Sequence, residues 1–142
     1  MGGKIYVVSK IDALRLFEEA YKYIEEQRKS IIERIYEAYK KSLENRKLKY
    51  DKEKLLKEAE NTANAIINDI KISLITSTSR LISAISKIED DEFYKEEYER
   101  NIKYLSEDFK ENLNNYVEYF IKQFDAQSSL IAFASRKPII VD

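Results

Sequence analysis

The feature that most restricts the fold of this chain is the absence of glycine and proline from nearly its whole length. Its two glycines are Gly2 and Gly3, and its one proline is Pro138. Glycine and proline are the strongest interruptions of helices. Any break between them must therefore come from clusters of polar residues, and long helices are expected.

Two polar clusters mark such breaks, residues 45–51 and residues 89–91, and each ends in an aspartate. An aspartate at this position can accept hydrogen bonds from the free N–H groups that begin the next helix. Ser9 and Asp12 have the spacing of a capping box at the start of the first helix. The helices are therefore predicted over residues 10–46, 52–88 and 91–135.

Apolar residues recur along each predicted helix in steps of three and four that fit an eleven-residue repeat, about 3.67 residues per turn. This period predicts straight or slightly right-handed packing. The predicted core positions are Phe17, Tyr21, Ile24, Arg28, Ile32, Ile35, Tyr39 and Leu43 in the first helix, Ala59, Ala63, Ile66, Ile70, Leu74, Ser77, Leu81, Ile85 and Ile88 in the second, and Tyr94, Tyr98, Ile102, Leu105, Phe109, Leu113, Tyr116, Phe120, Phe124, Gln127 and Ile131 in the third.

Three long helices with short connections are predicted to form an elongated, up-down-up antiparallel three-helix bundle. The chain has 142 residues, a usual size for one domain. We therefore predict an all-α fold with a single helical domain over residues 1–142. Residues 1–9 and 136–142 are predicted to be short extended segments at its two ends.

The composition excludes several kinds of chemistry, because the chain contains no histidine and no cysteine. The common zinc sites, cysteine nucleophiles, histidine acid–base groups and disulfides are therefore absent. The Glu-x-x-His motif of helical carboxylate metal sites cannot occur, and no glycine-rich phosphate loop lies between Lys4 and Lys137. We predict a non-enzymatic protein with no catalytic residues, no metal site and no cofactor.

Hydropathy indicates where such a chain would be found. No apolar stretch of about 20 residues could span a bilayer, and the N-terminus lacks the apolar region of a signal peptide. We expect a soluble protein, cytoplasmic or virion-internal, that does not insert into a membrane. Its charged, glutamine-poor composition is typical of hyperthermophile proteins, although an AT-rich genome gives a similar bias.

Arg28 occupies a position where the repeat of the first helix expects an apolar residue. In an antiparallel hairpin that turns near Lys49, residue 28 is level with Ile70, so Asp69 or Ser73 could accept a hydrogen bond from its guanidinium. A buried ion pair of this kind can fix the register between two helices. We predict Arg28 and Asp69 as register-setting residues. The alternative is that Arg28 extends from the edge of the core into water.

Hydroxyl side chains are concentrated in residues 73–79, which read SLITSTS. Serine and threonine are neutral to unfavourable inside helices, because their side chains compete for backbone hydrogen bonds. Their small size does allow neighbouring helices to approach closely. We predict a packing role, with a kink or a partner-binding face as the alternatives.

Charges of opposite sign are concentrated at the two predicted connections between helices. Basic residues outnumber acidic ones from Lys40 to Lys57, and acidic residues predominate from Glu89 to Glu99. Such runs usually form a solvated surface. The alternative is attraction between opposite ends of neighbouring copies. The predicted electrostatic-end residues are Lys40, Lys41, Arg46, Lys47 and Lys49, together with Glu89, Asp90, Asp91 and Glu92.

Short apolar segments precede the first helix and follow the third. The predicted assembly residues are Ile5, Tyr6, Val7 and Val8 in the first segment and Ile139, Ile140 and Val141 in the second. After three antiparallel passes the segments should lie about 50 Å apart or more, so they cannot pair within one molecule. An unpaired apolar strand is a template for another chain, which predicts head-to-tail contact in a filament or ring. The alternative is that each segment folds back on its own bundle.

These observations favour a structural or scaffolding protein that self-associates as a homo-oligomer. The competing interpretation is a structural protein that coats nucleic acid, such as the coat subunit of a helical virion. Its phosphate contacts would come from the region Lys40 to Lys57. A net charge of −1 gives the chain no general basic excess for that role.

Overall fold

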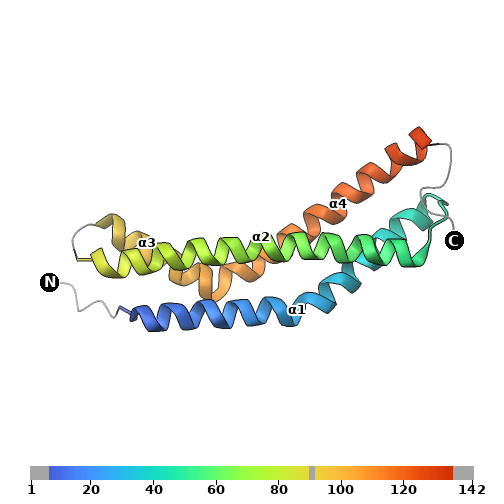
Figure 1. Cartoon of the computed structure of the whole chain (residues 1–142). Helices are drawn as coiled ribbons and strands as arrows, with labels where there is room; N and C mark the ends of the chain where they lie inside the picture. Colours follow the sequence, from blue (N-terminus) through green and yellow to red (C-terminus); the bar gives the residue numbers. More distant parts are fainter. Residues whose placement is uncertain (1–6, 90–91, 136–142) are drawn as a thin grey trace. The chain divides into compact units, whose positions relative to one another are not determined.

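A computed structural model describes residues 7–89 and 92–135 of the chain, with side chains as far as residue 127 (Figure 1). Its elements are α1 (Lys10–Asn45), α2 (Lys52–Lys87), α3 (Glu92–Lys103), the π-helical segment η1 (Tyr104–Asp108) and α4 (Phe109–Ser135). The last three follow one another without a break, so they form the third predicted helix. The predicted all-α fold of three long antiparallel helices is confirmed.

The backbone packs as two compact units, which we describe separately. Unit 1 comprises Met1–Ile24 and Asp69–Asn112, and unit 2 comprises Glu25–Asn68 and Leu113–Asp142. Each long helix therefore contributes one part to each unit.

Unit 1 brings together the first part of α1, the second part of α2 and the stretch that contains α3 and η1. The backbone N–H of Val8 donates to the Tyr98 hydroxyl (3.0 Å), and the Tyr23 ring packs edge-on against Phe109 with 5.6 Å between centroids. The earlier residue of the first stretch, Val8, contacts the earlier residue of the third helix, and the later residue, Tyr23, contacts the later one. The first part of α1 and the stretch that begins with α3 therefore run in the same direction. α2 runs opposite to both (Figure 1).

Unit 2 contains the second part of α1, the first part of α2 and α4. The Tyr39 ring stacks on Phe124 with 3.7 Å between centroids and an interplanar angle of 11°. Its hydroxyl lies 3.2 Å from the Thr62 hydroxyl of α2. Tyr39 of α1 therefore contacts both neighbouring helices of this unit.

Burial confirms the eleven-residue repeat in α1 and α2. Fully buried residues eleven positions apart are Ala13, Ile24 and Ile35 in α1 and Ala59, Ile70 and Leu81 in α2, each with 0% exposure. In α2 the buried residues include the predicted positions from Ala59 to Leu81, and Ser77 and Thr78 of the SLITSTS segment are buried among them.

The predicted core positions of α1 need correction. Ala20 and Ile31 are buried, whereas Phe17 and Ile32 are half-buried and Tyr21 is exposed. The Lys71 ammonium lies 4.3 Å from the centre of the Tyr21 ring, so that ring lies at the edge of the bundle against a cation. Small Ala20 beside it lets the helices approach more closely than a tyrosine would. The predicted repeat is correct, but the buried positions Ala20 and Ile31 each lie one residue before the predicted positions Tyr21 and Ile32.

The π-helical segment changes which residues of the third helix are buried. The buried positions are spaced by four residues: Asn101, Leu105, Phe109, Leu113 and Val117. Each step of four moves a side chain about 40° further around an ordinary α-helix. The wider turn of η1 takes up part of this rotation and keeps the residues on one side. The predicted positions Ile102 and Tyr116 are consequently only half-buried.

Hydrogen bonds at the helix ends follow the predicted pattern. The N–H of Asp12 donates to Ser9 Oγ (3.1 Å), and the N–H of Ser9 donates to Asp12 Oδ2 (3.3 Å), which confirms the capping box. Asp51 Oδ1 accepts from the N–H groups of Glu53 (2.9 Å) and Lys54 (3.4 Å). Asp91 lies outside the described residues.

The end of α1 has a Schellman motif that the sequence did not indicate. The N–H of Leu48 donates to the Leu43 carbonyl (2.9 Å), and the N–H of Lys47 donates to the Glu44 carbonyl (3.0 Å). This geometry places Lys47 in the left-handed region, with φ of 56°. Glycine usually occupies this position, because a β-carbon is unfavourable there.

Replacing Lys47 with glycine is therefore expected to stabilise the protein by up to about 1 kcal/mol. Thermal or urea unfolding of the purified variant measures the change. Lys49→Gly is the matched control, because Lys49 lies in the same turn without a positive φ. It should be neutral or destabilising. Equal effects of both substitutions would contradict the role assigned to Lys47.

Candidate functional site

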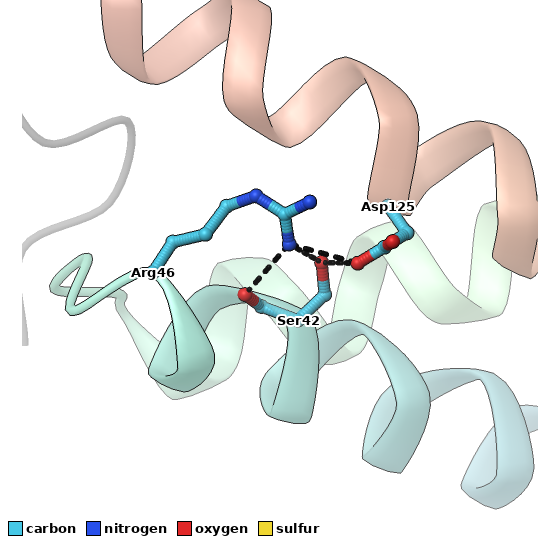
Figure 2. Close-up of polar contacts among 3 residues, drawn as sticks. All are labelled: Ser42, Arg46 and Asp125. Atoms are coloured by element: carbon cyan, nitrogen blue, oxygen red, sulfur yellow. Dashed lines mark hydrogen bonds and ion pairs between the residues drawn. The ribbon is translucent and has the colours of Figure 1, made fainter.

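The clearest polar cluster of unit 2 links α1 to α4 and consists of Ser42, Arg46 and Asp125 (Figure 2). Ser42 Oγ donates to Asp125 Oδ1 (2.6 Å), and Arg46 Nη1 donates to the same oxygen (2.8 Å). Arg46 Nη1 also donates to Ser42 Oγ (3.0 Å) and to the Ser42 carbonyl (3.3 Å). Arg46, predicted as part of an electrostatic end, is therefore bound to a carboxylate.

The chemistry of this cluster suits a structural link. Hydrogen bonds from Arg46 and then Ser42 lower the pKa of Asp125 below its ordinary value. A carboxylate with a lowered pKa is a weak base, and a guanidinium has no acceptor for a proton. The arrangement therefore does not activate the Ser42 hydroxyl as a nucleophile.

The lowered pKa predicts an acid-sensitive contribution to stability. The contribution should be present above the ordinary aspartate pKa of about 3.9 and be lost as the pH falls through the lower pKa of the folded state. Asp125→Asn should thus destabilise the protein at neutral pH and make progressively less difference in acid. Because 56% of the Asp125 side chain is exposed, we expect a loss of no more than about 1 kcal/mol.

Urea unfolding at neutral and acidic pH measures this difference, and Glu111→Gln, at an exposed glutamate of α4, is the control. If the Asp125→Asn difference does not shrink as the pH falls, the carboxylate is not the source of the effect.

A second polar region lies in unit 1, in a groove of about 310 Å³ between α2 and the stretch from α3 to the start of α4. We call it the α2–α3 groove. Its walls include Ile72, Ser73, Thr76 and Arg80 from α2, with Arg100 and Tyr104 opposite. Tyr104 is the first residue of η1, so the π-helical segment forms part of the wall. None of the described residues that line the groove is acidic.

Arg28 forms a different set of contacts from the predicted pair. Its Nε donates to Glu25 Oε2 (3.1 Å), its Nη2 donates to Glu25 Oε1 (3.2 Å), and its Nη1 donates to the Asn64 side-chain oxygen. The guanidinium therefore links α1 to α2 within unit 2, through an amide instead of a carboxylate. Asp69 belongs to unit 1, and its pairing with Arg28 stays a prediction.

The predicted electrostatic ends are only partly covered by the described residues. Lys41, Lys47 and Lys49 are exposed and Lys40 is half-buried in unit 2. In unit 1, Glu89 and Glu92 are exposed. Asp90 and Asp91 lie outside the described residues. Attraction between these ends stays a prediction.

The predicted assembly residues are mostly outside the described part as well, namely Ile5, Tyr6, Ile139, Ile140 and Val141. Val7 and Val8 are half-buried and lie in no strand. The hydrogen bond from Val8 to Tyr98 joins the N-terminal segment to α3 of the same chain. This contact favours the fold-back alternative at Val8, and head-to-tail pairing of the two terminal segments stays a prediction.

Unit 1 also exposes large apolar side chains that the sequence analysis did not single out. Ile11 is 71% exposed and Leu14 48% on α1, and Ile72 is 61% exposed and Ile75 53% on α2. The contact between Lys71 and the Tyr21 ring places these stretches of α1 and α2 side by side.

None of the described helices is both long enough and apolar enough to cross a membrane.

Comparison with known proteins gave no match to a family model, a curated protein or a solved structure.

Sequence reasoning missed Asp125 and Asn101. Asp125 appeared as one of many acidic residues, and its partner Ser42 lies 83 positions away. A signal for Asn101 was present, because residues 101, 105, 109, 113 and 117 repeat at intervals of four. That spacing fits a π-helical insertion better than a regular helix.

Proposed function

We propose that this chain is a non-enzymatic structural protein that self-associates side by side through unit 1. The observation that supports this proposal best is the exposure of Ile11, Leu14 and Ile75 on adjoining stretches of α1 and α2. Scattered exposed apolar residues are normal, but a patch of them is typical of an interaction surface.

The spacing of these residues makes them one surface. Ile11, Leu14 and Tyr21 lie on one side of α1, at intervals of three and seven residues. Ile75 is one turn beyond Lys71, whose ammonium contacts the Tyr21 ring. A helix of a neighbouring molecule could pack along this apolar strip as a fourth helix packs onto a bundle.

A second copy of this chain is the occupant that the charges favour. The chain contains 25 basic and 26 acidic residues, which gives a net charge of −1. Net charge near zero promotes association, because copies do not repel one another. Exposed residues of both signs, including Lys10 and Glu18, border the strip, so opposite charges can meet across a two-fold interface.

Replacing Leu14 and Ile75 together with glutamine is expected to raise the dissociation constant of the oligomer at least about tenfold. Each substitution removes apolar surface from the proposed interface while keeping a good helix former. Leu56→Gln is the matched control, because Leu56 is 41% exposed but lies in unit 2. Sedimentation velocity measures the oligomer, and circular dichroism verifies the fold. An equal effect of the control and the double variant would rule out this surface.

Coating of nucleic acid is the second candidate, and the observation in its favour is the exposure of lysines around the turn between α1 and α2. Lys41, Lys47, Lys49, Lys52 and Lys54 are all exposed. Filter binding to duplex DNA over a series of salt concentrations tests it. A steep fall of affinity with salt supports coating, and no binding at low salt removes it.

A further inference from the structure

The α2–α3 groove of unit 1 combines positive charge with hydroxyl groups in a way that the packing of the bundle does not require. Two arginines line it, Arg80 from α2 and Arg100 from α3, and no carboxylate of residues 7–89 or 92–127 does. Within the part of the chain that the structure describes, Arg80 forms no hydrogen bond or ion pair, although acidic residues are plentiful. Arg100 Nη1 lies 3.6 Å from Glu97 Oε2, and the Arg100 side chain is 62% exposed. Both guanidinium groups therefore retain donors for a ligand.

Neighbouring side chains are held in place by their own hydrogen bonds. Ser77 Oγ donates to Asn101 Oδ1 (2.8 Å). Asn101 Nδ2 donates to the Glu97 carbonyl (2.7 Å) and to Glu97 Oε2 (3.0 Å). These bonds fix the floor of the groove and restrain Glu97, whose Oε2 lies 3.6 Å from Arg100 Nη1.

Tyr104 offers a further donor at the groove. Its hydroxyl oxygen accepts a hydrogen bond from Asn112 Nδ2 (2.9 Å), which leaves the hydroxyl hydrogen for another acceptor. The adjacent Thr76 is exposed and contributes a second hydroxyl. Tyr104 begins η1, and π-helical segments occur frequently at functional sites.

We propose that the α2–α3 groove binds the phosphate group of an organic phosphate. Guanidinium groups bind phosphate oxygens through paired, charge-assisted hydrogen bonds, and the hydroxyls of Tyr104 and Thr76 supply further donors. Ile72, 61% exposed on the α2 wall, offers apolar surface for the organic part of the ligand. The phosphate comes either from a small phosphate monoester or from the phosphodiester backbone of a nucleic acid.

Isothermal titration calorimetry of the full chain tests the site with three probes: inorganic phosphate, phenyl phosphate and a single-stranded oligonucleotide. Phenyl phosphate is expected to bind more tightly than inorganic phosphate if the ligand is a small monoester. The oligonucleotide is expected to bind more tightly than both if the source is a phosphodiester backbone. Arg80→Gln and Arg100→Gln should each weaken the preferred probe at least about tenfold.

The matched control is Arg15→Gln, because Arg15 is an exposed arginine of unit 1 outside the groove, with 67% of its side chain exposed. It should leave binding unchanged. Thermal unfolding shows whether the variants fold like the original chain, and all three replace exposed side chains. The proposal is overturned if no probe binds saturably, or if the Arg15 variant loses as much affinity as the groove variants. Neither result would bear on self-association.

Discussion

Deleting Glu111 is expected to lower the free energy of unfolding by more than about 4 kcal/mol, whereas deleting Ser106 should leave the fold intact. Both residues are exposed, and they lie five positions apart in the third helix. Glu111 belongs to the regular helix α4, and Ser106 belongs to the π-helical segment η1. The contrast therefore isolates the geometry of the helix from the loss of a side chain.

The two deletions are expected to differ because a deletion rotates one part of a helix about its axis relative to the other. Removing one residue from a regular α-helix turns everything on one side of the deletion by about 100°. Leu113 and Val117, now buried, would turn away from the core, and each is worth about 1.5–3 kcal/mol. Removing Ser106 converts the wide turn of η1 into an ordinary one. Leu105 and Phe109 would then be three positions apart and still share a face.

Circular dichroism and urea unfolding of both deletion variants measure the difference. If the Ser106 deletion proves as damaging as the Glu111 deletion, η1 does not act as a one-residue insertion that keeps the buried face in phase.

Replacing Ile70 with alanine is expected to cost about 2–5 kcal/mol of unfolding free energy. Ile70 is 0% exposed. It lies eleven residues after Ala59 and eleven before Leu81, which are also fully buried. Truncating it removes buried apolar atoms and leaves a cavity that tightly packed neighbours fill only in part.

Ile72→Ala is the matched control for this substitution. Ile72 has the same side chain two residues further along α2, but it is 61% exposed. Its replacement should change stability by no more than about 0.5 kcal/mol. Urea unfolding compares the two variants, and similar losses would mean that the buried face of α2 has been assigned incorrectly.

The elements of this fold were predictable because local chemistry determines them. Without glycine or proline from Lys4 to Lys137, only capped polar clusters could end a helix, and the structure has helix boundaries there. Ser9, Asp12 and Asp51 form the hydrogen bonds that their sequence positions implied. In α2 the predicted core positions from Ala59 to Leu81 were also correct.

The contacts between helices were not predictable, because they depend on how each helix is rotated about its axis. An apolar repeat defines that rotation only to about one residue, or 100°. In α1 this was enough to exchange Tyr21 for Ala20 in the core. The same uncertainty hid the partners of polar side chains, including Arg46 with Asp125 and Arg28 with Asn64.

The two irregular features, the left-handed conformation of Lys47 and the π-helical segment η1, had weaker signals in the sequence. Lys47 adopts a conformation that the sequence would announce only with glycine or asparagine. Among the candidate sites, the sequence indicated the basic region from Lys40 to Lys57. It indicated neither the link at Asp125 nor the α2–α3 groove.

The most direct test of the proposed function is the native mass of the full chain, measured by sedimentation equilibrium over a wide range of protein concentration at low salt. Side-by-side association through unit 1 predicts a weight-average mass that rises with concentration to at least twice the mass of one chain. A mass that stays at that of a single chain at every concentration would contradict it.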